Sequence, residues 1–221
     1  GKFPVTIELV IVPFIASFLL GFAIAIARLK KVPGLEQLLA LYVSYVRCTP
    51  VITQMFIVYF GLPILLANFG INANKWNPVI FVFIAYSINI SAFLSETIRS
   101  SILAVPAGQM EAGYAVGMTS FQTMRGIIVP QALKISLPML ENLFIGLFQA
   151  TALAYMVGVI DMIGKAKNLS TSKGHLLEGY ICCAIVFAII SLSLEVIFRF
   201  VNKRLEFGQK NEYVGKRRAR A

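Results

Sequence analysis

The sequence is short of the residues on which most enzyme chemistry depends. Ten Asp and Glu stand against twenty Lys and Arg in 221 residues, and there is one histidine. That histidine, His175, is alone in a polar loop, and we interpret it as a loop residue rather than a ligand. Of the three cysteines, two are adjacent in an apolar run, and none has the spacing of a metal site. We interpret them as packing residues.

A nucleotide-binding loop is also missing. Gly164 and Lys165 follow Gly158 with one residue too many, and Ala166 replaces the Ser or Thr that a phosphate-binding loop needs. Long polar segments are scarce too, since the longest are the C-terminal tail and the loop 165–175. We therefore expect a chain that is not itself an enzyme and contains no soluble domain.

What the sequence has in abundance is apolar residues. They make up 58% of the chain, and the mean hydropathy is +0.79, well above the composition of soluble domains. Runs without charge, most of them near the ~20 residues of a spanning helix, predict five transmembrane helices in an all-α membrane protein. These runs cover 9–27, 48–74, 76–95, 142–160 and 179–194. The second is expected to hold one helix and an outer turn, because it contains Pro63, Asn68, Gly70 and Asn72.

The positive charge is distributed as in a membrane protein, not as in a nucleic-acid-binding protein. With five spans and the basic tail 202–221 in the cytosol, most Lys and Arg lie inside, which predicts an outer N-terminus. The tail is interpreted as a topology anchor that favours anionic lipid. The residues left outside are Lys2, Lys75, Lys165, Lys167 and Lys173.

The chain has no internal repeat. Many secondary transporters build their site between two related halves of one chain, and five helices make a thin wall for a solute path. We therefore expect a second copy, or a related chain, to complete the path across a pseudo-twofold axis.

The segment 111–130 is too polar to span a membrane and too apolar for a solvated loop. It is predicted to be a helix, a break at Gly117, where glycine permits positive φ, and a second helix ending near Pro130. Its apolar side chains would face the cytosol unless a partner covers them, which indicates a docking element. The alternative is an amphipathic helix on the inner leaflet, although such helices are usually richer in Lys and Arg. The apolar set, taken over 107–130, is Met110, Tyr114, Met118, Phe121 and Met124.

The same segment resembles the EAA coupling motif of ABC importer permeases. The pattern is E-A-G, three residues, Gly117, nine residues, Ile127, one residue and Val129-Pro130, with Gly113 for the second alanine and Val129 for leucine. Upstream, V-R-C-T-P-V-I-T-Q-M-F-I-V-Y-F-G-L-P at 46–63 resembles a block of the polar amino-acid permeases. S-E-T-I-R at 95–99 and P-Q-A-L at 130–133 extend the resemblance over nearly the whole chain.

This resemblance implies a type I ABC importer permease fold, as one transmembrane domain over 1–221 with a coupling loop at 105–130. It implies a bacterial inner-membrane importer with two permease subunits, two cytosolic ATPase subunits and an external amino-acid-binding protein. No cofactor is expected in this chain, because ATP and Mg would be bound by the ATPase. The implied ATPase-coupling residues are Glu111, Ala112, Gly113, Tyr114, Gly117, Met118, Arg125 and Pro130.

Polar residues inside the spans are candidates for the substrate path, because such groups usually face a cavity or another helix. Helix packing is the competing interpretation, especially for Ser and Thr. The candidates are Arg47, Thr49, Gln54, Tyr59, Asn89, Ser91, Glu96, Asn142, Gln149 and Thr151.

The substrate is predicted only through the resemblance. Gln149 and Ala150 stand where the family often has Lys and Asp, which implies a less charged central pocket. Asp161 resembles a family acidic position, or is simply a charge at an outer helix end. The passages V-I-D-M-I-G and H-L-L-E-G-Y resemble cystine-type permeases, so cystine is the first candidate, with arginine, histidine, glutamine and glutamate open. The rival functions are an ion-coupled secondary transporter and a structural membrane or channel subunit.

Overall fold

The computed structural model describes residues 2–218, although the side chains of Lys173 and of 205–218 lie outside the description. The predicted basic tail therefore falls mostly outside the described side chains. The regular elements within 2–218 are all helical. The long helices are α1 (Phe3–Leu29), α2 (Leu35–Cys48), α5 (Pro78–Leu103), α8 (Val129–Ala150), α9 (Met162–Lys173) and α10 (Leu176–Arg218). The shorter ones are α3 (Val51–Phe56), η1 (Ile57–Gly61), α4 (Leu62–Ala67), η2 (Ala73–Lys75), α6 (Ala107–Ala115), α7 (Ser120–Thr123), η3 (Met124–Ile128) and η4 (Thr151–Val157).

Four helices in the described part are long and apolar enough to cross a membrane, and a bent pair brings the number to five. The four are Phe3–Leu29, Pro78–Leu103, Ser120–Val157 and Leu176–Arg204. The pair joins Leu35–Cys48 to Val51–Ala67 through a bend of 110°. The predicted all-helical membrane fold is confirmed, and the five predicted spans match the higher count.

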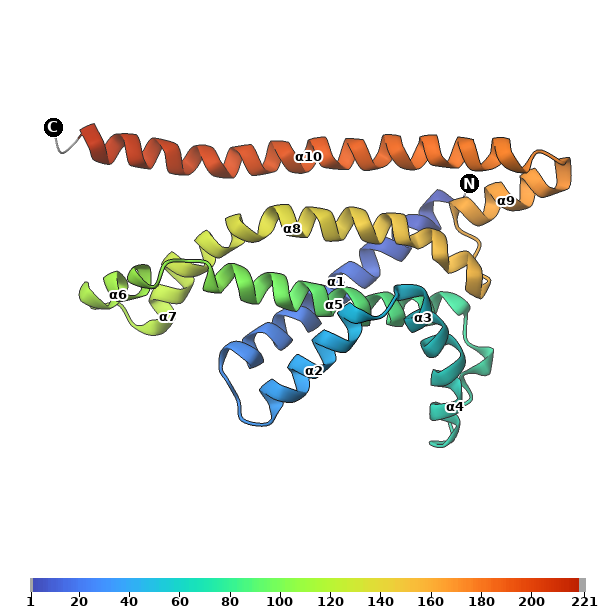
Figure 1. The fold of residues 1–221 in the computed structure, drawn as a ribbon, viewed down its shortest axis with the longest axis horizontal. Coiled ribbons are helices and arrows are strands. Elements are labelled where there is room, and N and C mark those ends of the chain that lie inside the picture. Colours follow the sequence, from blue (N-terminus) through green and yellow to red (C-terminus); the bar gives the residue numbers. More distant parts are fainter. Residues whose placement is uncertain (1, 219–221) are drawn as a thin grey trace.

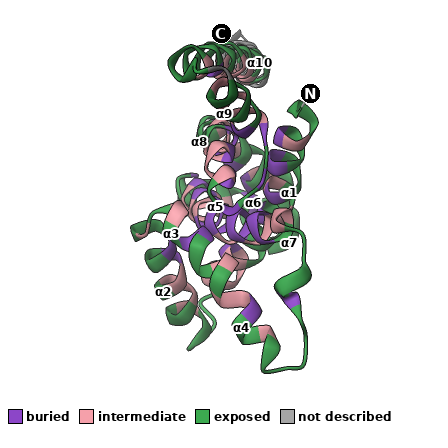
Figure 2. Ribbon diagram, turned by 90° about the vertical axis from the view of Figure 1, so that its right-hand side faces the viewer, coloured by how far each residue is buried: buried purple, intermediate pink, exposed green. Residues whose placement is uncertain are grey.

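Helix α5 is the centre of the fold, and purple buried residues concentrate along it in Figure 2. It packs against α1, α8, α2 and α3. Small residues allow α1 to approach closely: a Cβ on Gly21 would lie 2.9 Å from both Leu94 Cβ and Ser91 O. Beside this contact, Ser17 Oγ donates to Ser87 O at 3.1 Å. Such contacts between small residues are typical of helix pairs in membranes.

Helix α10 lies at the edge of the molecule, along α8 (Figure 1). It packs mainly on α8 and α9, and most of its apolar side chains are exposed. An apolar surface of this kind in a membrane protein is suited to lipid or to another membrane chain.

The prediction of a second helix that ends near Pro130 is wrong. The chain is one continuous helix from Ser120 to Val157. The π turn η3 lies just before the proline and is closed by the Val129 N–H, which donates to Met124 O. A π turn widens the backbone locally, so the proline ring fits without ending the helix.

Candidate functional site

Helices α2 and α3 meet at the sharp bend between Cys48 and Val51, which we call the α2–α3 corner, and this bend contains Pro50. Pro50 has no N–H, so the carbonyl of Val46, four residues earlier, loses its usual helical donor. The side chain of Gln54 supplies a replacement, because its Nε2 donates to Val46 O at 2.8 Å and to Thr49 Oγ1 at 2.6 Å. Gln54 is buried, and a buried carbonyl without a donor would be costly. Gln54 therefore fixes the corner.

The same glutamine ties the corner to α5. Because Nε2 is used on the α2 carbonyl, Oε1 faces α5, where Asn89 Nδ2 donates to it at 3.0 Å. This chain of bonds sets the orientation of the Asn89 amide. Asn89 is buried and lines a cavity between α5 and α8.

Two adjoining cavities form a groove along α5. The first is about 200 Å³ and the second about 420 Å³, and they share Phe93, Asn142 and Leu143. We call their combination the α5–α8 groove. The first cavity is lined by Val51, Tyr86, Asn89, Ile90, Phe93, Asn142, Leu143, Gly146, Leu147 and Ala150. The second is lined by Arg47, Phe93, Glu96, Thr97, Ser100, Met139, Asn142 and Leu143. Since Arg47, Asn142 and Gly146 are exposed, this chain forms only one wall of the groove.

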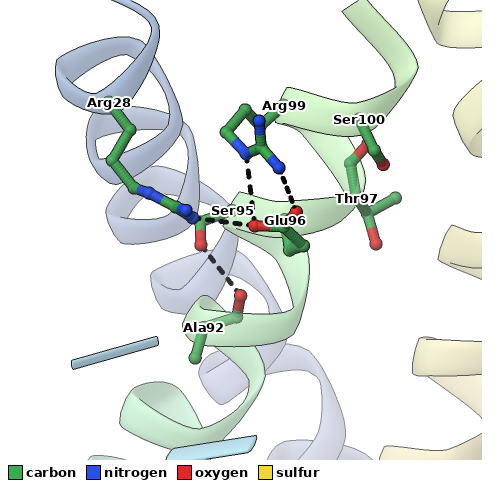
Figure 3. Close-up of polar contacts among 7 residues, drawn as sticks. All are labelled: Arg28, Ala92, Ser95, Glu96, Thr97, Arg99 and Ser100. Atoms are coloured by element: carbon green, nitrogen blue, oxygen red, sulfur yellow. Dashed lines mark hydrogen bonds and ion pairs between the residues drawn. The ribbon is translucent and has the colours of Figure 1, made fainter. Parts of the chain in front are cut away.

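An ion cluster adjoins the larger cavity through Glu96, and its side chains are drawn in Figure 3. Arg28, from the last turn of α1, donates from Nη1 to Glu96 Oε2 at 2.7 Å, and Arg99 bonds both carboxylate oxygens. These side chains are only 15% to 28% exposed. The cluster therefore fastens the end of α1 to α5 beside the groove.

Glu96→Gln is expected to lower the stability of the chain by weakening the contact between the end of α1 and α5. It leaves Arg28 and Arg99 facing each other without a shared anion, at a cost of about 2 kcal/mol, below the roughly 3–5 kcal/mol of a fully buried pair. Thermal unfolding of the purified chain in detergent measures the loss. The control is Glu195→Gln, which removes the exposed Arg199–Glu195 pair and should change the midpoint little. Equal shifts in the two variants would contradict the assignment.

The structure brings some of the predicted path residues together and separates others. Arg47, Asn89, Glu96 and Asn142 line the groove, and Gln54 and Thr49 stand behind Asn89. The rest lie elsewhere: Tyr59 contacts Phe81 at the far end of α5, Ser91 bonds Tyr42, Gln149 approaches Ser191 on α10, and Thr151 donates to Phe148 O.

Sequence reasoning missed Phe93 and the two partners of Glu96. The spacing of Glu96 and Arg99, three apart on one helix face, was a readable signal. No local pattern connects Arg28 to Glu96, 68 residues away.

The predicted coupling loop forms a compact helical elbow. Helix α6 ends in a Schellman motif: Met118 N–H donates to Gly113 O, Gly117 N–H donates to Tyr114 O, and Gly117 has a φ of +80°. Helix α7 starts at Ser120, three residues after Gly117, with a capping box between Thr119 and Gln122. The break predicted at Gly117 is present.

The two helices of the elbow touch at Gly113, which is buried. A Cβ at this position would lie 2.5 Å from Thr123 Cγ2. Tyr114 O–H and Ser120 Oγ, 3.1 Å apart, join the helices a second time. Glycine at 113, the departure from the family pattern, therefore permits close contact between α6 and α7.

Not all of the apolar side chains predicted to face outward do so. Tyr114 and Phe121 are exposed, at 48% and 72%, and Val116, absent from the prediction, reaches 76%. Met110 and Met124 instead pack against the chain's own cluster of Val105, Ile128 and Ala132. Glu111, Ala112 and Arg125 are exposed on the same elbow, and Met118 is half-buried.

The contacts of Asp161 and His175 are with neighbouring residues of this chain, and these two residues and the cysteines lie outside the lining of the groove. Asp161 is fully buried and caps α9, with Oδ1 accepting from Gly164 N–H at 2.8 Å. Burial raises the pKa of this carboxyl. His175 lies 3.1 Å from Glu178, and the described residues contain no cluster of three or more His, Cys, Asp or Glu suited to a metal. Cys183 is buried, as expected of a packing residue, whereas Cys48 and Cys182 are exposed and do not pack inside this chain.

The bent membrane span, the groove that is open on one side and the exposed elbow are features of one subunit of a larger membrane assembly. Residues 17–207 match the family of binding-protein-dependent transport system inner membrane components. The chain belongs to this family, which makes it a multi-pass inner-membrane permease of an ABC amino-acid importer and not itself an ATPase.

Relatives and a solved structure agree with this assignment. The chain is 35% identical to the L-cystine transport system permease protein TcyL of Bacillus subtilis (strain 168), over 93% of this chain and 86% of that protein. It is 37% identical to TcyB, another L-cystine transport system permease protein of the same organism, over 91% and 83%. A chain in the crystal structure of an amino acid ABC transporter with histidines superposes with a TM-score of 0.82 at 28% identity, with 92% of each chain covered.

Proposed function

We propose that this chain forms, with a second permease subunit, an alternating-access path for a polar amino acid, and that cystine is the first candidate substrate. The observation that supports this most directly is the α5–α8 groove, whose exposed side needs a second wall. An identical or homologous permease supplies that wall. Similarity to two cystine permeases supports the choice of cystine.

The elbow is proposed to receive the ATPase. Val116 and Phe121 of the elbow are exposed apolar side chains. The elbow lies beyond the last turn of α5 (Figure 1), and we assign this end of the molecule to the cytosol, with the N-terminus outside. Two ATPase subunits bind ATP and Mg there, while an external binding protein delivers the amino acid at the other end.

The continuous helix from Ser120 to Val157 supports a mechanism for coupling. Its first turns belong to the elbow, and its later residues Met139, Asn142, Leu143 and Gly146 line the groove. A movement of the elbow is therefore carried to the groove wall along one continuous helix. Such an element suits a switch between two discrete arrangements.

Reconstitution of the complete complex in liposomes tests this function. The loaded binding protein and ATP are placed on opposite sides of the membrane, and uptake of labelled cystine, glutamine, glutamate and arginine is measured. We expect uptake that requires ATP and is unaffected by collapse of proton and sodium gradients. Uptake that follows an ion gradient without ATP would contradict the proposal and support the ion-coupled alternative. Downhill flux without ATP or a gradient would support a channel subunit.

A further inference from the structure

One cation of the groove has no anionic partner. Among the residues with described side chains, the ion pairs are Arg28–Glu96, Arg99–Glu96, His175–Glu178 and Arg199–Glu195. None includes Arg47, which lines the larger cavity. Its guanidinium carbon lies 5.8 Å from the centroid of the Phe93 ring. Phe93 lines both cavities, so this charge stands close to their junction.

The carboxylate of Glu96, which lines the groove, is already paired with other arginines. Glu96 is the acidic residue in the lining of the two cavities, and its two oxygens are shared by Arg28 and Arg99. Arg28, Arg47 and Arg99 stand against Glu96 and against Glu36, whose charge also acts on Arg99, so the formal charge around this end of the groove is +1. A transported cation would meet repulsion there, whereas an anionic group would find Arg47 free.

The smaller cavity offers a hydrogen-bond acceptor. The Asn89 amide is oriented through its Nδ2 bond to Gln54, and none of the hydrogen bonds within the described residues uses Asn89 Oδ1. Asn89 and Phe93 are four residues apart on α5, about 6 Å along the helix. An α-amino acid carries its ammonium and carboxylate groups on one carbon, so with a hydrogen bond of about 3 Å to each group the two protein ligands lie roughly one helical turn apart.

We propose that Arg47 binds the carboxylate of the transported amino acid, that Asn89 Oδ1 accepts from its ammonium, and that the groove selects neutral and acidic amino acids over those with cationic side chains. This inference rests on the proposed function and narrows its substrate class. Cystine, with two carboxylates balanced by two ammonium groups, belongs to the favoured class, and arginine does not.

Binding to the purified permease–ATPase complex in nanodiscs tests this assignment. The binding protein is omitted because it makes its own selection. The probes are labelled glutamine, glutamate, cystine and arginine, with glutamine α-amide as an unlabelled competitor that lacks the carboxylate. Loss of a charge-assisted pair is expected to weaken binding by about ten-fold or more. The amide and arginine should therefore bind at least about ten-fold more weakly than glutamine.

Substitutions at position 47 show whether Arg47 binds the substrate carboxylate or only supports the fold. Arg47→Gln should remove the preference for glutamine over its amide, and Arg47→Lys, which keeps the charge without the planar fork, should retain part of it. Gln149→Leu, on the α10 side of α8, is the control and should keep the full preference.

Equal binding of glutamine and its amide, or of glutamine and arginine, would overturn the inference, as would an unchanged preference in Arg47→Gln. Absence of saturable binding by all four amino acids to the unsubstituted complex would also overturn it. The dependence of uptake on ATP is measured separately, so failure of this inference can be told from failure of the proposed function.

Discussion

Gly113→Val is expected to reduce ATP-driven uptake by about ten-fold or more, although residue 113 is far from the groove. A Cβ at this position would lie 2.5 Å from Thr123 Cγ2 and 2.6 Å from Thr123 Oγ1. Overpacking of this kind costs about 1–3 kcal/mol, and separation of α6 from α7 would relieve it. The elbow would then no longer transmit movement to the continuous helix. Uptake by liposomes that contain the complete complex is the measurement.

The control for this variant is Gly108→Val in the same short helix. Position 108 is exposed, and a Cβ there meets nothing within 4 Å, so uptake should stay close to that of the unsubstituted complex. Co-purification of the ATPase shows whether the Gly113→Val complex still assembles. Normal uptake by Gly113→Val would contradict coupling through the continuous helix, whereas equal losses in both variants would show that any valine in α6 disturbs docking.

The sequence predicts the elements whose signals are local. Charge-free runs locate the spans, and the break at Gly117 follows from a glycine with a φ of +80°. The capping box of Thr119 and Gln122 was equally readable, since both partners lie within four residues. Pro130 shows where local reasoning fails: proline usually ends a helix, but the π turn of η3 accommodates it here.

The groove could be predicted only as a set of candidates. Polar residues in the spans mark positions that avoid lipid, but they do not say which face another helix and which face a cavity. Asn89 and Ser91 are two residues apart on α5, yet one lines the groove and the other bonds Tyr42. Arg28 and Glu96 meet because α1 crosses α5, and this crossing depends on small residues such as Gly21.

Gly146→Trp should abolish uptake by filling the groove. Gly146 lines the first cavity, and a Cβ there meets no atom within 4 Å. A large side chain can therefore enter the open space without displacing α5 or α8, and the indole would occupy much of a cavity of about 200 Å³. Gln149→Trp places the same side chain on α8 at an exposed position near Ser191, so it is a size-matched control.

A comparison of ATP-driven uptake by these two tryptophan variants tests most directly whether the α5–α8 groove is the path of the amino acid. Each complex must first co-purify with its ATPase in the proportion of the unsubstituted complex. The account predicts no measurable uptake for Gly146→Trp and nearly normal uptake for Gln149→Trp. Substantial uptake by an assembled Gly146→Trp complex would contradict it and would place the path outside this groove.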